Sequence, residues 1–121
     1  MARIAFAQVV HGCDLQWWES LSCQACGART EADGGDDMPP ERRKMLLEQE
    51  GNSSVITAGQ PTTRLLQAAR FWLGLSIAQL PALKARLPGV LATGTRSEME
   101  VLACRLNRAA GSDVSLEVVR G

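Results

Sequence analysis

Residues 61–119 read PTTRLLQAARFWLGLSIAQLPALKARLPGVLATGTRSEMEVLACRLNRAAGSDVSLEVV, and this stretch decides the fold. Near its end, Thr95-Arg96-Ser97-Glu98 has the spacing of a capping box, in which Thr95 and Glu98 satisfy each other's backbone N–H groups. Apolar residues then recur at steps of three and four, at Met99, Leu102, Ala103, Leu106 and Ala110. Because this spacing places them on one helical face, and Gly111 is a typical stop, the pattern predicts a capped helix from about residue 96 to 110.

The residues after this helix predict a closing strand. Between residues 113 and 119, Val114, Leu116 and Val118 alternate with Ser115 and Glu117. Side chains of a strand point alternately to opposite faces, so this alternation is typical of a strand with one buried face.

Two helices and a strand are predicted before the capped helix. Pro61 suits the first turn of a helix, and Gly74 ends that helix. Its predicted buried face consists of Leu65, Leu66, Ala69 and Trp72. Ser76 can cap the second helix, which must end before Pro88 and whose first turn Pro81 makes irregular. Its apolar side consists of Leu80, Leu83, Ala85 and Leu87. Residues 89–93 then form a short apolar strand.

This order of elements, with the motifs LGLS, PGVLATGT and NRAAG…VSLEVV, resembles the C-terminal domain of the bacterial ribosomal stalk protein. If residues 55–58 supply a first strand, the resemblance implies a β-α-α-β-α-β domain with a three-stranded antiparallel sheet. Its helices lie on one face, a shape shared in outline with the adaptor of the Clp protease. In the stalk family the first helix contacts translation GTPases through lysines. At the matching positions, 62–72, this chain carries Arg64 and Arg70, which the resemblance implies as partner-binding residues.

Composition limits the classes of partner. The chain has 121 residues, 45% of them apolar, which suits one domain or two small ones. Thirteen basic and thirteen acidic residues balance to zero net charge, so no overall field favours nucleic acid. No run approaches the roughly 20 apolar residues of a membrane-spanning helix, and the N-terminus lacks the pattern of a signal peptide. We therefore expect a cytoplasmic chain without a membrane partner. In such a reducing compartment, the four cysteines are expected to be thiols or metal ligands before disulfides.

The first half predicts a small β-rich unit. Residues 3–10 form a nearly continuous apolar run, and residues 15–22 contain Trp17 and Trp18 side by side. Neighbouring strand residues point to opposite faces, so one tryptophan fills a core. The other either packs beneath the C-terminal half or stands exposed as an anchor for a partner.

Cys23-Gln24-Ala25-Cys26-Gly27 is the main chemical signal, because two thiolates separated by two residues can hold one metal ion. The motif resembles one knuckle of a zinc ribbon, although a second knuckle is absent. If residues 9–22 fold back as a hairpin, His11 and Cys13 can complete a Cys3His zinc site with Cys23 and Cys26. A small unit with little core often needs such a staple.

Other roles for the cysteines stay open. Cys23 and Cys26 can be free thiols or a thiol–disulfide redox pair. In that case His11 is an ordinary loop residue and Cys13 is an ordinary buried cysteine. Cys104 lies with Val101 on a second strip of the last helix, away from the main apolar stripe. This strip is available for contact with the N-terminal unit or a second chain. If the metal site lacks His11 and the two halves pack closely, Cys104 is the reserve fourth ligand.

The two halves meet near residue 51. Residues 31–37, EADGGDD, predict an exposed linker, because the Glu and flanking helices of a calcium loop are missing. Asp37 is placed to cap a helix that ends near Gly51. The sequence therefore predicts an α+β protein with a zinc-stapled unit at 1–51 and a stalk-like domain at 52–121.

The residue set favours binding over catalysis. The chain has one histidine, no phosphate loop and no nucleophile elbow. We expect a non-enzymatic protein-interaction module, an adaptor or inhibitor, with structural zinc and with Trp17, Trp18, Arg64 and Arg70 as contact residues. A ribosome- or translation-factor-associated protein is one alternative, and a redox protein using Cys23 and Cys26 is another.

Overall fold

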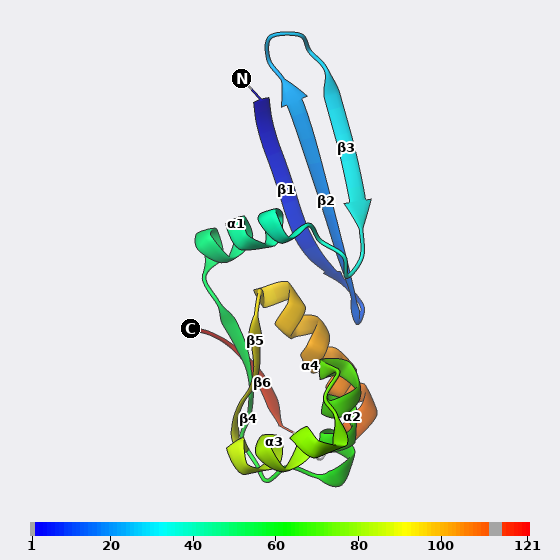
Figure 1. The fold of residues 1–121 in the computed structure, drawn as a ribbon, viewed down its shortest axis with the longest axis vertical. Coiled ribbons are helices and arrows are strands. Elements are labelled where there is room, and N and C mark those ends of the chain that lie inside the picture. The colour runs from blue at the N-terminus through cyan, green and yellow to red at the C-terminus, as the bar shows by residue number, and fades with distance from the viewer. Residues whose placement is uncertain (1, 112–114) are drawn as a thin grey trace.

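A computed structural model describes residues 2–111 and 115–121 of the chain. It contains two three-stranded antiparallel sheets, one in each half, with strand orders β1-β2-β3 and β5-β4-β6 (Figure 1). Helices accompany both sheets, which confirms the predicted α+β class.

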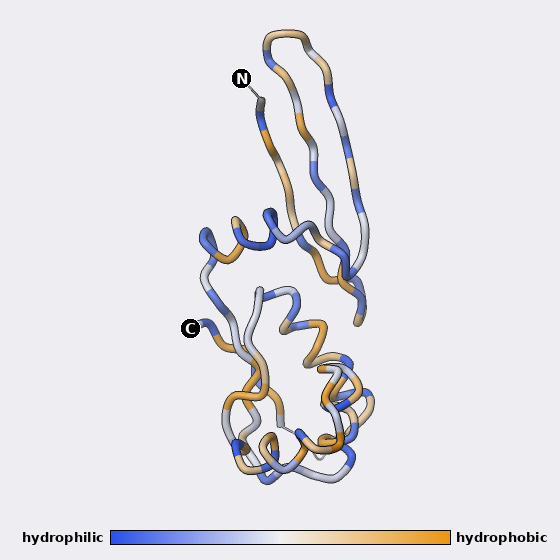
Figure 2. The backbone as a smooth tube through the Cα atoms, viewed as in Figure 1, coloured by the Kyte–Doolittle hydropathy of each residue, from blue (hydrophilic) through white to orange (hydrophobic). Residues whose placement is uncertain are grey.

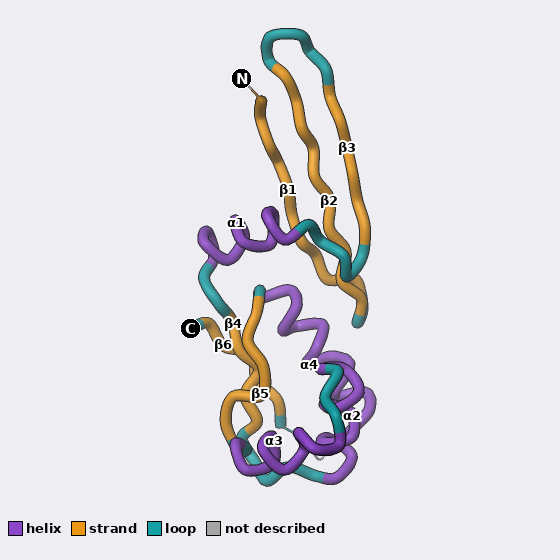
Figure 3. Tube along the Cα trace, in the orientation of Figure 1, coloured by secondary structure: helices purple, strands orange, loops and turns teal. Residues whose placement is uncertain are grey.

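The N-terminal sheet projects from the rest of the molecule as an arm, the name we use for β1 to β3 (Figure 1). Its strands are β1 (Ala2–His11), β2 (Asp14–Cys23) and β3 (Arg29–Gly34). Only Gly12 and Cys13 separate the paired ends of β1 and β2, and the positive φ of Gly12 suits a two-residue hairpin turn. The loop from β2 to β3, residues 24–28, is the tip of the arm (Figure 3).

Residues 31–34 belong to strand β3, which differs from the prediction of an exposed linker at residues 31–37. Its charged and glycine-containing sequence, RTEADG, pairs with β2 from Arg29 to Gly34. All its residues from Arg29 to Asp33 are exposed, so backbone pairing with β2 holds the strand without an apolar face.

Helix α1 (Pro40–Glu50) crosses the base of the arm (Figure 3). A small core forms there from Trp17, Met38 and Leu46, with Phe6 packed against it. The prediction that Asp37 caps this helix is wrong, because Pro39 occupies the N-cap position. The Asp37 carboxylate instead accepts a hydrogen bond from Trp17 Nε1 at 2.9 Å, which fixes the buried indole.

The C-terminal half follows the predicted order of elements. In chain order they are β4 (Ser53–Thr57), α2 (Thr63–Leu73), the 3-10 turn η1 (Ile77–Gln79), α3 (Leu80–Arg86), β5 (Gly89–Gly94), α4 (Arg96–Ala110) and β6 (Leu116–Arg120). Strand β4 is central, and the helices lie together on one face of the sheet (Figure 1). Their shared core includes Val55, Leu65 and Leu106, each almost fully buried.

Local signals within this half hold in detail. The capping box forms, with Thr95 Oγ1 accepting from the Glu98 amide at 3.1 Å and Glu98 Oε1 from the Thr95 amide at 3.0 Å. The irregular turn predicted around Pro81 is η1. Trp72 differs, since its ring is partly exposed instead of belonging to the buried face. The first two residues of the predicted closing strand, Asp113 and Val114, lie outside the described residues.

The two halves are joined at the base of the arm. Cys13, in the hairpin turn, forms a disulfide with Cys104 in α4, with a Cα–Cα distance of 5.4 Å. Next to it, Arg105 Nε donates to the Cys13 carbonyl oxygen at 2.9 Å. Arg43 of α1 binds Glu98 of α4 through two hydrogen bonds of 2.7 and 2.8 Å. Covalent and charged contacts thus fasten the arm to α4.

Candidate functional site

The structure does not assemble the predicted Cys3His set. His11 and Cys13 lie at the hairpin turn, whereas Cys23 is at the opposite end of the ten-residue strand β2, where it pairs with Ala2. A strand rises about 3.3 Å per residue, so the two groups are about 30 Å apart. Cys13 is also bonded to Cys104. The prediction that these four residues form one metal site is therefore wrong.

The disulfide has a partial signal in the sequence. The strip of α4 that carries Val101 and Cys104 faces the arm. Contact with the N-terminal unit is one of the two roles that the sequence predicts for this strip. Because Cys104 is bonded, it is not a reserve metal ligand. The prediction of thiols or metal ahead of disulfides is wrong for Cys13 and Cys104, whose pairing depends on how the halves pack.

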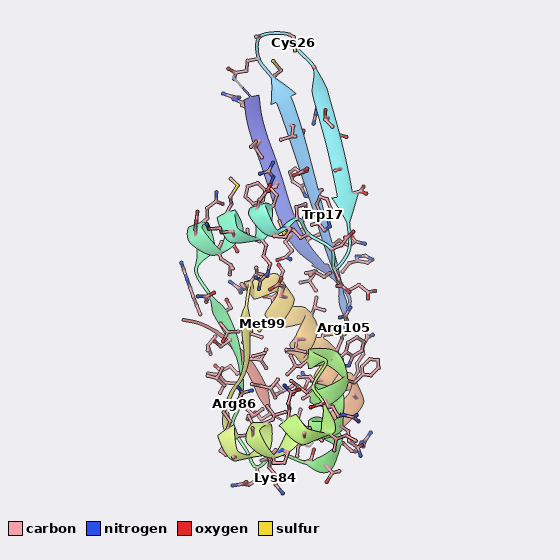
Figure 4. All side chains as sticks on the ribbon, in the orientation of Figure 1. Trp17, Cys26, Lys84, Arg86, Met99 and Arg105 are labelled. Carbon is pink, nitrogen blue, oxygen red and sulfur yellow. A yellow bond between two sulfur atoms is a disulfide. The ribbon has the colours of Figure 1, made fainter. Side chains whose placement is uncertain are left out.

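Cys26 lies at the tip of the arm (Figure 4), and Cys23 is the last residue of β2, directly before the tip. Two backbone hydrogen bonds close the turn, from the Gly27 amide to the Cys23 carbonyl and from the Cys23 amide to the Ala28 carbonyl, both 2.8 Å. Gly27 has φ 73, which favours glycine at this position.

The turn directs hydrogen-bond donors at one sulfur. The side chain of Cys26 hydrogen-bonds the Cys23 thiolate, and the backbone amides of Cys26 and Ala25 add to this, so the pKa of Cys23 lies below its ordinary value. Hydrogen bonds to a thiolate stabilise its charged form and tune it as a ligand or nucleophile. These hydrogen bonds therefore favour the charged form of Cys23 at the end of the arm.

The described part of the chain surrounds this pair with no complete set of metal ligands. Within residues 2–111 and 115–121, no group of three or more His, Cys, Asp or Glu side chains is close enough to hold a metal ion. Any tetrahedral site at the tip needs ligands from another molecule.

The two tryptophans take opposite faces of β2, as predicted. Trp17 is buried in the core under α1, so the prediction that it is a partner-contact residue is wrong, while Trp18 is exposed on the other face. Trp18 lines an open groove of about 730 Å³ together with Asp14, Asp33, Asp36 and Arg105. The Arg105 guanidinium lies 3.7 Å from Asp14 and 3.9 Å from Asp36, so this groove is partly neutralised from within.

A second exposed surface covers α2 and η1. We call Arg64, Arg70, Phe71, Trp72 and Ile77 the α2 patch. Arg64 and Arg70 are exposed, and Phe71 and Ile77 are 73% and 68% exposed. The Phe71 and Trp72 rings meet edge to face with centroids 4.8 Å apart. Arg105 holds the other side of this pair, with its Cζ 4.5 Å from the centroid of Trp72.

Sequence reasoning found the arginines of the α2 patch and missed Phe71 and Ile77. Residues 64, 67 and 71 follow helical spacing and form an exposed strip beside the buried Leu65, Ala68 and Ala69. The same periodicity that predicted the buried face therefore contained the signal, because Phe71 falls outside that predicted face.

Comparisons with protein-family models, curated proteins and solved structures found no match to this chain. In the part of the chain that the structure describes, no helix has the length and apolar character needed to span a membrane.

Proposed function

We propose that this protein is a protein-binding module, an adaptor or inhibitor, that engages its partner through the α2 patch. The observation that carries the proposal is the exposure of Phe71, a large apolar ring on the outward face of a well-capped helix. Arg, Trp and other aromatic side chains are enriched at protein–protein interfaces, whereas single aliphatic side chains on a surface are not.

The composition of the patch indicates the chemistry of the partner. Two exposed arginines lie on the same helix as Phe71: Arg70 directly before it and Arg64 two turns earlier. An apolar side chain on the partner would cover Phe71, while carboxylates beside it would meet the arginines. We infer a partner with an acidic surface around an apolar anchor.

The helix itself is built to present these side chains in fixed positions. Thr62 caps its N-terminus, accepting from the Leu65 amide at 3.1 Å, and Gly74 ends it in a left-handed conformation. The stack of Phe71, Trp72 and Arg105 restricts the aromatic pair before binding. Less side-chain freedom is then lost on association, which favours affinity.

The experiment is a binding measurement on a purified pair. A stoichiometric partner is isolated by affinity capture, and its affinity is measured for the wild type, Phe71→Ala and the double variant Arg64→Glu/Arg70→Glu. We expect affinity to fall by about 10- to 100-fold for Phe71→Ala, the range of a hot-spot residue. The charge reversal should slow association and remove its dependence on salt.

Val90→Ser provides a matched control, because Val90 is also exposed and apolar but lies on β5. It should bind like the wild type. Wild-type affinity in both Phe71→Ala and the double arginine variant would remove the proposal.

A translation GTPase is the specific partner that the resemblance to the ribosomal stalk domain favours, because α2 carries Arg64 and Arg70 at the positions matching the contact helix of that family. Co-sedimentation with ribosomes and translation GTPases at low salt tests this version. If neither binds, the role in translation is rejected. The general role as a protein-binding module is tested separately by the affinities of the Phe71 and arginine variants.

A further inference from the structure

The tip of the arm has the ligands for half of a metal site. Cys23 ends β2 and Cys26 lies in the loop that follows, where the Gly27 amide donates to the Cys23 carbonyl at 2.8 Å and closes the turn between the two cysteines. Two cysteines held in this way at a glycine-containing turn bind one ion through both sulfurs. Soft thiolate ligands in a tetrahedral arrangement favour Zn²⁺ over Mg²⁺ or Ca²⁺.

A single chain cannot complete this site from the described residues. A closed zinc site takes four protein ligands, and no third Cys, His, Asp or Glu lies close enough to the two sulfurs. His11 is at the far end of the hairpin, and Cys13 and Cys104 are bonded to each other. The remaining ligands must therefore come from outside the described residues of this chain.

The shape of the molecule permits two tips to meet. The arm places the tip far from the C-terminal domain, with Cys26 at one extreme end of the molecule (Figures 1 and 4). Both cysteines are at least partly accessible, and Cys26 is exposed. Two arms can therefore approach end to end without contact between the larger domains.

Charges beside the tip reduce the repulsion between two thiolate pairs. Four thiolates around one Zn²⁺ carry a net charge of about −2. Arg3 and Arg29 both pair with Ser22, the residue next to Cys23, from the two neighbouring strands. Glu31 binds Arg29 at 3.0 Å in an exposed ion pair, which leaves each chain with a positive excess close to the sulfurs.

We propose that Cys23 and Cys26 from two copies of this chain bind one Zn²⁺ as a tetrathiolate and join the copies tip to tip. Each thiol that is still protonated releases its proton to solvent when its sulfur binds the ion. The site lies far from the α2 patch, so it acts independently of the proposed function and leaves two α2 patches on one assembly.

The test is a titration with Co²⁺ and Zn²⁺ of the full-length chain, in which the Cys13–Cys104 disulfide is intact and Cys23 and Cys26 are free thiols. We expect the sulfur-to-cobalt absorption of a tetrahedral tetrathiolate, with an end point of about half a metal ion per chain. Light scattering should show the mass double on addition of Zn²⁺ and return to that of the monomer with a chelator.

Three variants separate this site from the alternatives. Cys23→Ser and Cys26→Ser should each lower metal affinity at least about 100-fold and abolish the dimer, because a ligand is lost. His11→Ala should retain the wild-type end point and affinity. Thermal unfolding of all three in the absence of metal should match the wild type, since the mutated side chains lie at the tip and the turn outside both cores.

Three outcomes would overturn the proposal. One is a metal ion bound per monomeric chain, and another is a loss of affinity in His11→Ala. The third is an absence of metal binding while a low-molecular-weight disulfide converts Cys23 and Cys26 into a disulfide, which would assign the pair to redox chemistry.

Discussion

The arm and the C-terminal domain are held together by different forces. Helices and strands of the C-terminal domain share one core, in which Val55, Ala69 and Leu106 have no exposed surface. The arm has a core only at its base, and apolar residues continue along β1 beyond it (Figure 2). Strand pairing and attachments to α1 and α4 therefore stabilise the arm, whereas burial of apolar side chains stabilises the domain. The stability of the arm should consequently depend on single contacts.

The disulfide between Cys13 and Cys104 provides the largest test of this difference. Replacing both cysteines with alanine should lower the free energy of unfolding by about 4–5 kcal/mol, because the bond closes a loop with a sequence separation of 91. Urea unfolding followed by tryptophan fluorescence measures the change. A loss below about 1 kcal/mol would mean that noncovalent contacts alone attach the arm.

Matched truncations in the two regions sharpen the comparison. Leu106→Ala should lower the free energy of unfolding by about 3–4 kcal/mol, because it opens a cavity in a fully buried site. Ile4→Ala, on the outer part of the arm where the side chain is 43% exposed, should cost less than about 1 kcal/mol. Chemical denaturation of both variants gives the two values, and equal losses would show that the arm has a core of its own.

The pH dependence of the junction gives a smaller effect. Burial raises the pKa of Glu98, but hydrogen bonds from Arg43 and Thr95 outweigh it and hold the pKa below its ordinary value. The carboxylate therefore stabilises the folded state above the pKa of an unfolded glutamate. This contribution disappears as pH falls through the lowered folded pKa.

Glu98→Gln should cost about 1 kcal/mol at neutral pH and flatten the acid side of the stability profile, since the ion pair is partly exposed. Urea midpoints measured between pH 7 and pH 3 test both effects. If wild type and variant lose stability in parallel over this range, Arg43 and Glu98 contribute nothing as an ion pair.

The same contrast explains what the sequence could predict. The capping box at Thr95, the apolar stripe of α4 and the break at Gly74 are local signals, and each corresponds to the observed structure. Opposite faces for Trp17 and Trp18 also follow from strand geometry alone. In these cases the interacting residues are close in the sequence, so periodicity and capping suffice.

The failures involve contacts between distant residues. Strand β3 carries too many charges for an apolar pattern and is held by pairing with β2. The position of the hairpin turn decided whether His11 could meet Cys23, and a turn at Gly12-Cys13 sends them to opposite ends of β2. The bond to Cys104 requires the packing of the arm on α4, which no local pattern contains.

The disulfide also makes a covalent ring of the chain between Cys13 and Cys104, with only the first twelve and last seventeen residues outside it. A protease that cuts once at the tip of the arm, or at any other loop inside this ring, leaves a single molecule of unchanged covalent mass apart from one added water. Fragments would separate only after reduction. The loops most open to attack can thus be nicked without releasing any part of the protein.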